Sequence, residues 1–204
     1  MNNTQFVISE LHQSARLLEQ LSNETVTDIC ALGDLLVERL SAGNKVMIFG
    51  NGGSAADAQH FASELVGRYR LDRAPLRALS LNTDTSIMTS ISNDYGFSEV
   101  FSRQVRALAS QGDVVIGLST SGQSENVIAG LTAAREMKAH TVALIGSNNL
   151  GVCEIADLVI CVPSDETARV QEAHGVIIHI LCHIVEKTLT YSTDPQEAKE
   201  KPNP

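Results

Sequence analysis

The sequence predicts an α/β fold: a five-stranded parallel sheet with helices on both faces, preceded by an N-terminal helical arm. Three observations support this prediction. Short apolar runs of strand length alternate with amphipathic segments of helix length, which is the order of βαβ units. The strand runs lack the polar alternation of a half-exposed strand, so both faces of the sheet are expected to be covered. The first forty-odd residues show helical periodicity alone.

The N-terminal arm, residues 1–42, is predicted to contain two helices. Apolar residues recur at helical spacing from Phe6 to Leu21 and again from Val26 to Leu40. Asn23 or Thr25 is expected to cap the second helix, because either side chain can accept a hydrogen bond from a backbone N–H. Such an arm either packs on its own core or docks on a second copy of the chain. We favour the second arrangement.

The α/β core follows at residues 43–190 and forms a single domain with the arm, 1–190, since 204 residues suit one domain. Strands are expected at 45–50, 76–81, 113–118, 141–145 and 158–162. Helices are expected at 55–68, 84–92, 99–109, 124–137 and 168–189. The tail, 191–204, is polar and contains three prolines, so we expect it to be flexible.

Composition argues against several classes of function. A net charge of −9 and a pI near 5.1 disfavour nucleic-acid binding, which needs clustered Lys and Arg. The N-terminus has no basic region followed by an apolar segment, and no apolar stretch is long enough to cross a membrane. The four cysteines lack CxxC spacing and suit reduced thiols. We therefore expect a cytoplasmic protein with neither nucleic acid nor membrane as a partner.

Two loops rich in glycine and serine each follow a predicted strand and precede a predicted helix. The first, 50–54, reads GNGGS, and the second, 119–124, reads STSGQS. In such loops the backbone N–H groups, the hydroxyls and the positive end of the helix dipole can converge on an anion. Both loops fall at the carboxyl ends of strands, where open parallel sheets bind their ligands. One such loop alone is equally well an ordinary turn, but the pair favours a phosphorylated metabolite.

Neither loop matches a nucleotide-binding fingerprint. In the first loop Ala55 takes the place of the third glycine of GxGxxG, and the chain contains no GxxxxGK[ST] run. Nucleotide hydrolysis is therefore disfavoured.

Titratable side chains cluster on two predicted helices. His60 and Glu64 are four residues apart and share one helix face, and the last helix carries Gln171 and His179. A carboxylate and an imidazole suit proton transfer beside a carbonyl. The same side chains could equally hold a divalent metal, and a lone helical histidine is often only a core residue. Gln171 and His179 lie about 12 Å apart along an ideal helix. Both reach one ion only if Gln171 lies on an irregular first turn or if one ligand comes from a neighbouring subunit.

Segment 50–68, GNGGSAADAQHFASELVGR, resembles the signature of the bacterial phosphoheptose isomerases of the sugar isomerase (SIS) family. Three further segments match in the same order: NDYGF at 93–97, LSTSGQS at 118–124 and RVQEAH at 169–174, with His179 following. The resemblance extends over about residues 5–190. Two positions depart from it, with Gln123 where relatives often have Asn and Ala168 where some isomerases have Asp.

The resemblance implies a flavodoxin-like SIS fold, a homotetramer and an aldose–ketose isomerase. The reaction it implies converts sedoheptulose 7-phosphate to D-glycero-D-manno-heptose 7-phosphate through an enediol. That is the first step of nucleotide-activated heptose synthesis for lipopolysaccharide core or other surface glycans.

The resemblance also implies roles for individual residues. Glu64 is the expected base and His179 its acid/base partner. One zinc ion per subunit is expected on His60, Glu64, Gln171 and His179. The residues expected to line the sugar phosphate are Asn51, Gly52, Gly53, Ser54, Glu64, Asn93, Asp94, Ser119, Thr120, Ser121, Ser124 and Gln171. Arg68 is a further candidate for a phosphate or intersubunit contact.

The sequence leaves two alternative functions to consider. A non-enzymatic SIS relative binds the replication initiator protein, but it lacks the counterparts of Glu64 and His179, and both are present here. An isomerase of another keto-sugar phosphate, such as a hexulose phosphate or an amino sugar, is the second alternative. No residue in the sequence distinguishes this alternative from a phosphoheptose isomerase, because no residue indicates the length of the sugar chain directly.

Overall fold

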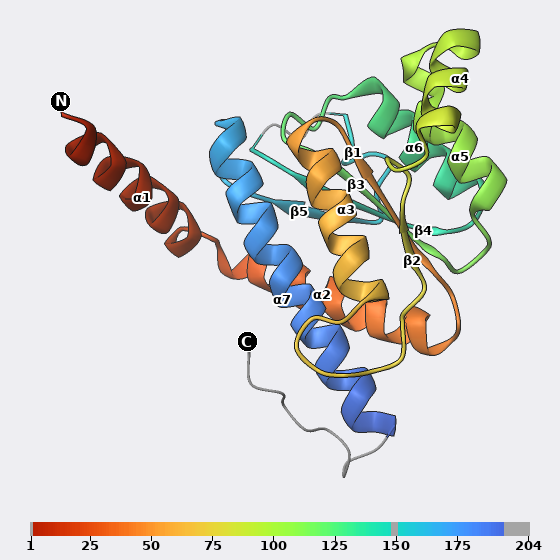
Figure 1. Cartoon of the computed structure of the whole chain (residues 1–204), viewed down its shortest axis with the longest axis horizontal. Helices are drawn as coiled ribbons and strands as arrows, with labels where there is room; N and C mark the ends of the chain where they lie inside the picture. Colours follow the sequence, from red (N-terminus) through yellow and green to blue (C-terminus); the bar gives the residue numbers. More distant parts are fainter. Residues whose placement is uncertain (1, 148–150, 194–204) are drawn as a thin grey trace.

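A five-stranded parallel sheet forms the centre of the chain, as the computed structural model in Figure 1 shows for the described residues, 2–147 and 151–193. The strands are β1 (Val46–Gly50), β2 (Ala78–Ser80), β3 (Val114–Ser119), β4 (His140–Ile145) and β5 (Leu158–Cys161). Their order across the sheet is β2-β1-β3-β4-β5, and every neighbouring pair is parallel. The predicted parallel α/β sheet is confirmed, although β2 is shorter than expected.

The helices cover both faces of this sheet. They are α1 (Asn3–Glu19), α2 (Asn23–Ser41), α3 (Gly53–Val66), α4 (Thr85–Tyr95), α5 (Val100–Leu108), α6 (Glu125–Glu136) and α7 (Thr167–Thr193), with a short 3-10 turn, η1 (Phe97–Glu99). Successive side chains of a strand point to opposite faces. Val46 and Ile48 therefore pack under α2, α3 and α7, while Met47 and Phe49 pack under α5 and α6. Both cores are fully buried, which explains the uninterrupted apolar runs.

The arm is divided between two environments. Helix α2 packs on α7 and the chain's own core, and Ser22 caps it by accepting the Thr25 N–H at 3.1 Å. The expectation that Asn23 or Thr25 is the cap was therefore wrong by a few residues. Helix α1 extends away from the sheet (Figure 1) and leaves Phe6 and Leu11 more than half exposed.

One side chain ties α1 to the start of α7. Arg169 is 9% exposed and donates to the backbone carbonyl of Glu10 at 2.8 Å. The same guanidinium bonds to the Glu172 carboxylate at 2.7 Å and lies 3.5 Å from that of Glu10. Arm and core are thus joined next to Gln171.

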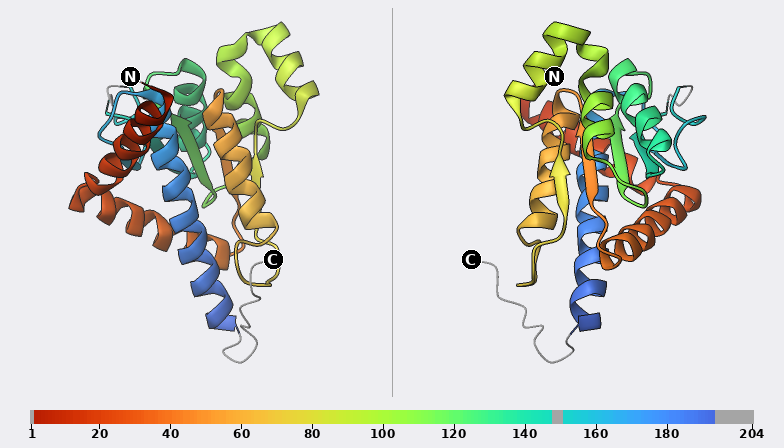
Figure 2. Two further views of the ribbon diagram at one scale, coloured as in Figure 1. Left: turned by 60° about the vertical axis from the view of Figure 1, so that its left-hand side comes forward. Right: turned by 90° about the vertical axis from the view of Figure 1, so that its right-hand side faces the viewer.

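Helix α4 projects from the body of the chain in Figure 2 and has no buried residue. Its main contacts among the described residues are with η1 and α5, and it leaves Ile87 and Tyr95 exposed. Of the predicted tail, residues 191–193 belong to α7 and the rest lies outside the described residues. Among the helices of the described ranges, none has the length and apolar character that a membrane crossing requires.

Candidate active site

The two glycine- and serine-rich loops lie side by side because β1 and β3 are neighbours, with Gly50 paired to Leu118. A Cβ at Gly50 would lie 2.9 Å from the Leu118 carbonyl oxygen and 2.8 Å from the Ser54 Cβ, so only glycine fits there. Gly52 has φ +57°, a conformation that L side chains rarely adopt. The glycines of the first loop therefore serve a tight turn between β1 and α3.

A reciprocal pair of amides joins the two loops. The Asn51 amide donates to Asn126 at 2.8 Å, and the Asn126 amide donates back at 3.0 Å. Asn126 is 4% exposed and lies in the first turn of α6. On the other side of the loop, Asn82 binds both the N–H and the carbonyl of Gly50, at 3.2 and 2.9 Å. The paired amide of Asn126 holds Asn51 in place. Sequence reasoning missed both Asn82 and Asn126.

The second loop gathers hydroxyl groups at the start of α6. Ser119 Oγ lies 3.1 Å from Ser124 Oγ and 3.5 Å from Ser121 Oγ, and Ser121 accepts the Gln123 N–H. Ser124 is the N-cap residue of α6, but its side chain makes no capping hydrogen bond. This end of the helix therefore has no side-chain cap, and its expected contact with a phosphate stays a prediction.

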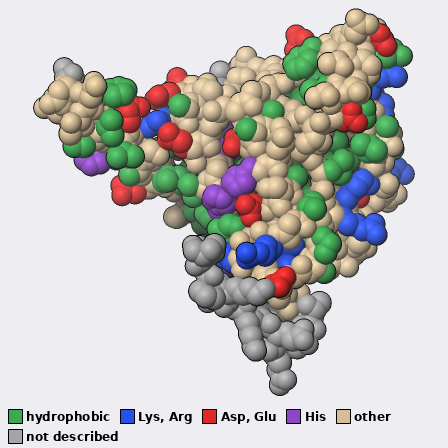
Figure 3. All heavy atoms as spheres, in the orientation of Figure 1, with side chains coloured by type: hydrophobic (Ala, Val, Ile, Leu, Met, Phe, Trp, Pro, Cys, Tyr) green, Lys and Arg blue, Asp and Glu red, His purple; other side chains and the backbone are tan. Residues whose placement is uncertain are grey.

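A carboxylate and two imidazoles converge where α3 and α7 run side by side (Figure 1). His60 Nε2 lies 3.4 Å from Glu64 Oε1 and 3.3 Å from His179 Nε2. The ligand atoms of all three residues lie within 4.8 Å of one another. Figure 3 shows histidine side chains gathered on the surface over these helices, and the side chains of His60 and Glu64 are 38% and 22% exposed. This cluster is open to a ligand.

The donor set and spacing of the cluster fit zinc. Nitrogen and carboxylate oxygen are ordinary zinc ligands, and tetrahedral bonds of 2.0–2.1 Å place neighbouring ligand atoms about 3.3–3.4 Å apart. Both measured separations from His60 have that length. One turn earlier on α3, a buried carboxylate oxygen of Asp57 has no hydrogen-bond partner among the described residues. Burial raises the pKa of Asp57, and the nearby His60 imidazole opposes that shift.

Comparison with known proteins places this arrangement in a family. The family model described as SIS domain matches residues 11–146. A phosphoheptose isomerase of Geotalea daltonii is 50% identical over 181 residues, which cover 89% of this chain and 94% of that protein. The solved phosphoheptose isomerase of Neisseria gonorrhoeae is 40% identical with a TM-score of 0.86, over 91% of this chain and all of that one. The one from Francisella tularensis is 33% identical with a TM-score of 0.88, over 92% of this chain and all of that one.

The chain belongs to the phosphoheptose isomerases of the SIS domain family. The predicted family, fold class and enzyme class are thereby confirmed.

Gln171 of this isomerase lies at the level of the first loop, away from the cluster. A Cβ built on Gly53 would be only 2.4 Å from Gln171 Nε2, so the amide rests on the start of α3. Helices α3 and α7 run parallel, and the contact between Gln171 and Gly53 is followed two turns later by that between His179 and His60. Because α7 begins at Thr167, Gln171 is inside a regular helix. It is separated from His179 along the helix axis by about 12 Å.

Asn93 and Asp94 of this isomerase lie on the exposed helix α4. Their side chains bond to each other at 2.7 Å, and no described contact joins them to either loop. Within one chain, their predicted role at the substrate stays a prediction.

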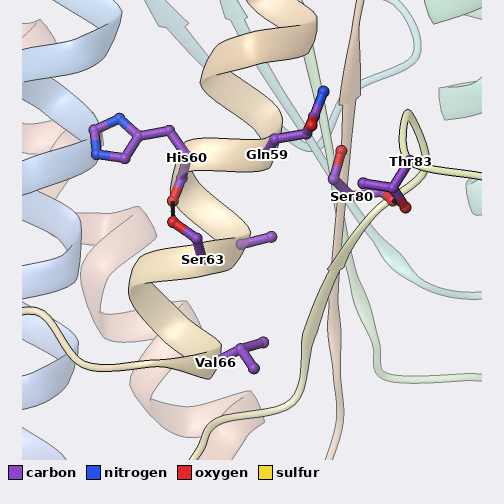
Figure 4. Close-up of a pocket in the computed structure, with 7 residues that line it drawn as sticks. Gln59, His60, Ser63, Val66, Ser80 and Thr83 are labelled. Atoms are coloured by element: carbon purple, nitrogen blue, oxygen red, sulfur yellow. Dashed lines mark hydrogen bonds between the residues drawn. The ribbon is translucent and has the colours of Figure 1, made fainter.

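A separate cleft of about 480 Å³ lies between α3 and the end of β2 (Figure 4). Its lining consists of Gln59, His60, Ala62, Ser63, Val66, Ser80 and Thr83. In Figure 4 the His60 ring points away from Gln59, Ser80 and Thr83, toward α7. The cleft therefore lies on the other side of α3 from the cluster. Its lining has no carboxylate, whereas the cluster contains that of Glu64.

Proposed function

We propose that this chain converts sedoheptulose 7-phosphate to D-glycero-D-manno-heptose 7-phosphate as the first step of nucleotide-activated heptose synthesis for surface glycans. The observation that carries the proposal is the convergence of Glu64 with His179 within 4.8 Å. It occurs in a chain whose close relatives are named phosphoheptose isomerases. The replication-initiator alternative is not favoured, because a binding protein has no need for this pair.

The chemistry follows from where the groups lie. The hydroxyls of Ser119, Ser121 and Ser124 and the first turn of α6 hold the phosphate. The Glu64 carboxylate takes the proton from C1 of the open-chain ketose, and an enediol forms. The proton returns at C2 to give the aldose, while the His179 imidazole moves the proton between the two sugar oxygens.

We propose that His60, Glu64 and His179 hold one zinc ion per subunit. Zinc bound there would polarise the sugar oxygens as a Lewis acid. Gln171 lies too far along α7 to complete the set from the same chain, so it would join from a neighbouring subunit. A metal-bound carboxylate is a weaker base, so Glu64 has two roles that an experiment can separate.

The assembly and the compartment are also part of the proposal. The exposed apolar residues of α1 and α4, Phe6, Leu11, Ile87 and Tyr95 among them, support a homotetramer. The four free cysteines support a cytoplasmic location.

Turnover of sedoheptulose 7-phosphate by purified protein tests the function. We expect Glu64→Gln to fold and to lose about 10²–10⁴-fold in kcat, because it keeps the shape of the side chain and removes the base. His179→Gln should lose comparably, whereas His140→Gln, at the amino end of β4, is the control and should not. A near-normal rate for Glu64→Gln would refute its role as the base.

Chelation tests the metal. Loss of turnover after chelation, with recovery on adding zinc, supports the zinc site, and unchanged turnover refutes a required and accessible metal. If the wild-type protein turns over a hexulose phosphate and not the heptulose phosphate, the substrate is the hexulose phosphate and the proposed heptose function is wrong.

A further inference from the structure

Residues 67–73, which we call the strap, leave the end of α3 and are bound to both helices of the cluster. Arg73 binds the α3 side: its guanidinium donates to the carbonyl of Glu64 at 2.8 Å and to that of Leu65 at 2.9 Å. Both carbonyls lie in the last turn of α3 and have no partner within the helix. The strap therefore holds the backbone of the residue that supplies the carboxylate.

The α7 side is bound through a buried carboxylate that the proposed mechanism does not use. Glu186 is 1% exposed and accepts three consecutive backbone N–H groups, those of Tyr69 at 2.9 Å, Arg70 at 2.7 Å and Leu71 at 2.9 Å. The Arg73 guanidinium lies 3.3 Å from the same carboxylate. A charge is stable at such depth only when it is paired and hydrogen-bonded, and these contacts tie the strap to α7.

This anchoring places an aromatic ring against the cluster. The Tyr69 ring stacks on the His179 ring with centroids 5.6 Å apart and planes inclined by 25°. The His60 ring meets the His179 ring edge-on, at 4.9 Å and 82°. Glu186 lies two turns after His179 on α7. Helix α7 thus carries the His179 imidazole and also, through Glu186, anchors the strap whose Tyr69 ring packs against that imidazole.

We propose that Tyr69 is a positioning residue that fixes the plane of the His179 imidazole, and that the buried Glu186–Arg73 pair fixes Tyr69. This inference rests on the proposed role of His179. The side chain of His179 lies at the surface, where an imidazole without a bound metal is free to rotate unless neighbouring rings restrain it. A proton-transfer group must keep its orientation to within a small angle, and the stack with Tyr69 supplies that restraint.

Two substitutions of Tyr69 separate the contribution of its ring from that of its hydroxyl. Tyr69→Phe keeps the stack and should retain kcat within about two-fold, whereas Tyr69→Leu should lower kcat about ten-fold or more with KM little changed. The melting temperature of both variants is measured alongside. Equal kcat for wild type and Tyr69→Leu would overturn the proposal. Equal losses in the Phe and Leu variants would also overturn it, because they would assign the effect to the hydroxyl.

A spectroscopic readout needs no turnover. The ring protons of His179, assigned by their absence from His179→Gln, feel the ring current of Tyr69 in the NMR spectrum. We expect these resonances to move in Tyr69→Leu and to stay in Tyr69→Phe. Unmoved resonances in Tyr69→Leu would refute the stack. If the shift is present but wild type does not isomerise the heptulose phosphate, the proposed function fails while the placement of the ring stands.

The anchor is tested by a double-mutant cycle. Glu186→Gln keeps the shape of the side chain and removes its charge. We expect it to lower kcat on its own and to add little to Tyr69→Leu, because both act through the same ring. Additive losses would show that Glu186 acts by another route and would refute the anchoring step. Should Glu186→Gln fail to fold, Arg73→Lys takes its place in the cycle with the same expectation.

Discussion

Substituting Gly53 by alanine should displace Gln171 without harming the fold. The new Cβ would lie 2.4 Å from Gln171 Nε2 and 2.6 Å from its Cδ and Oε1. Carbon needs about 3.5 Å, so the amide must retreat by roughly 1 Å. Because the amide is the end of a flexible side chain, it can retreat without a backbone shift. Alanine is also a better helix former than glycine by up to about 1 kcal/mol, so stability should hold or rise.

Turnover should nevertheless fall, because Gln171 leaves the position beside the first loop where the substrate is expected. A displacement of about 1 Å typically costs on the order of 10²-fold, so we expect kcat/KM to fall about 10- to 100-fold in Gly53→Ala. The assay compares steady-state turnover and melting temperature for Gly53→Ala, Gln171→Ala and the double variant. The double variant should match Gln171→Ala, since the displaced group is already gone. Full activity in Gly53→Ala, or additive losses, would refute this reasoning.

Three further predictions concern stability. Asn126→Ala leaves the half-buried amide of Asn51 without its partner and should lower the free energy of unfolding by about 1 kcal/mol, measured by urea denaturation. Burial lowers the pKa of His174 to about 4, so the unfolded chain takes up a proton near pH 6.5 that the folded chain does not yet accept. Stability should therefore fall between about pH 6.5 and 4, by up to about 3 kcal/mol, and His174→Phe should flatten that slope. Burial alone would raise the pKa of Asp113, but hydrogen bonds from Lys45 and from a second backbone N–H, together with the Lys45 charge, hold it below 3.8. Its contribution is present above that pH and lost below it, so Asp113→Asn should lower stability throughout the range above about pH 3.8 and flatten the slope at the acid end of the same profile.

The fold was largely predictable because its signals are local. Uninterrupted apolar runs mark strands buried on both faces, and β1 and β3 are indeed buried throughout. The cap of α2 was placed wrongly, at Asn23 or Thr25, because serine, threonine and asparagine are equivalent in propensity. Ser22 is the cap because its backbone is extended and the helix begins at the next residue.

The site was predictable only in part because its contacts are long-range. The spacing of His60 and Glu64 places both on one helix face, but their meeting with His179 depends on how α3 and α7 align. The amide bonds of Asn126 and Asn82 depend on the order of the strands, which hydrophobic periodicity does not encode. A local signal for Glu186 was present: a carboxylate in the apolar run of the last helix.

The link from the arm to the core through Arg169 bears on how activity responds to dilution. This guanidinium ties α1 to α7 two residues before Gln171, and α1 leaves an apolar face exposed. If α1 docks on a second copy, as we expect, separation of the copies removes support from the end of α7 that carries Gln171. Specific activity per chain would then decline at low protein concentration and recover when the sample is concentrated. Rates measured at different protein concentrations would therefore not be directly comparable.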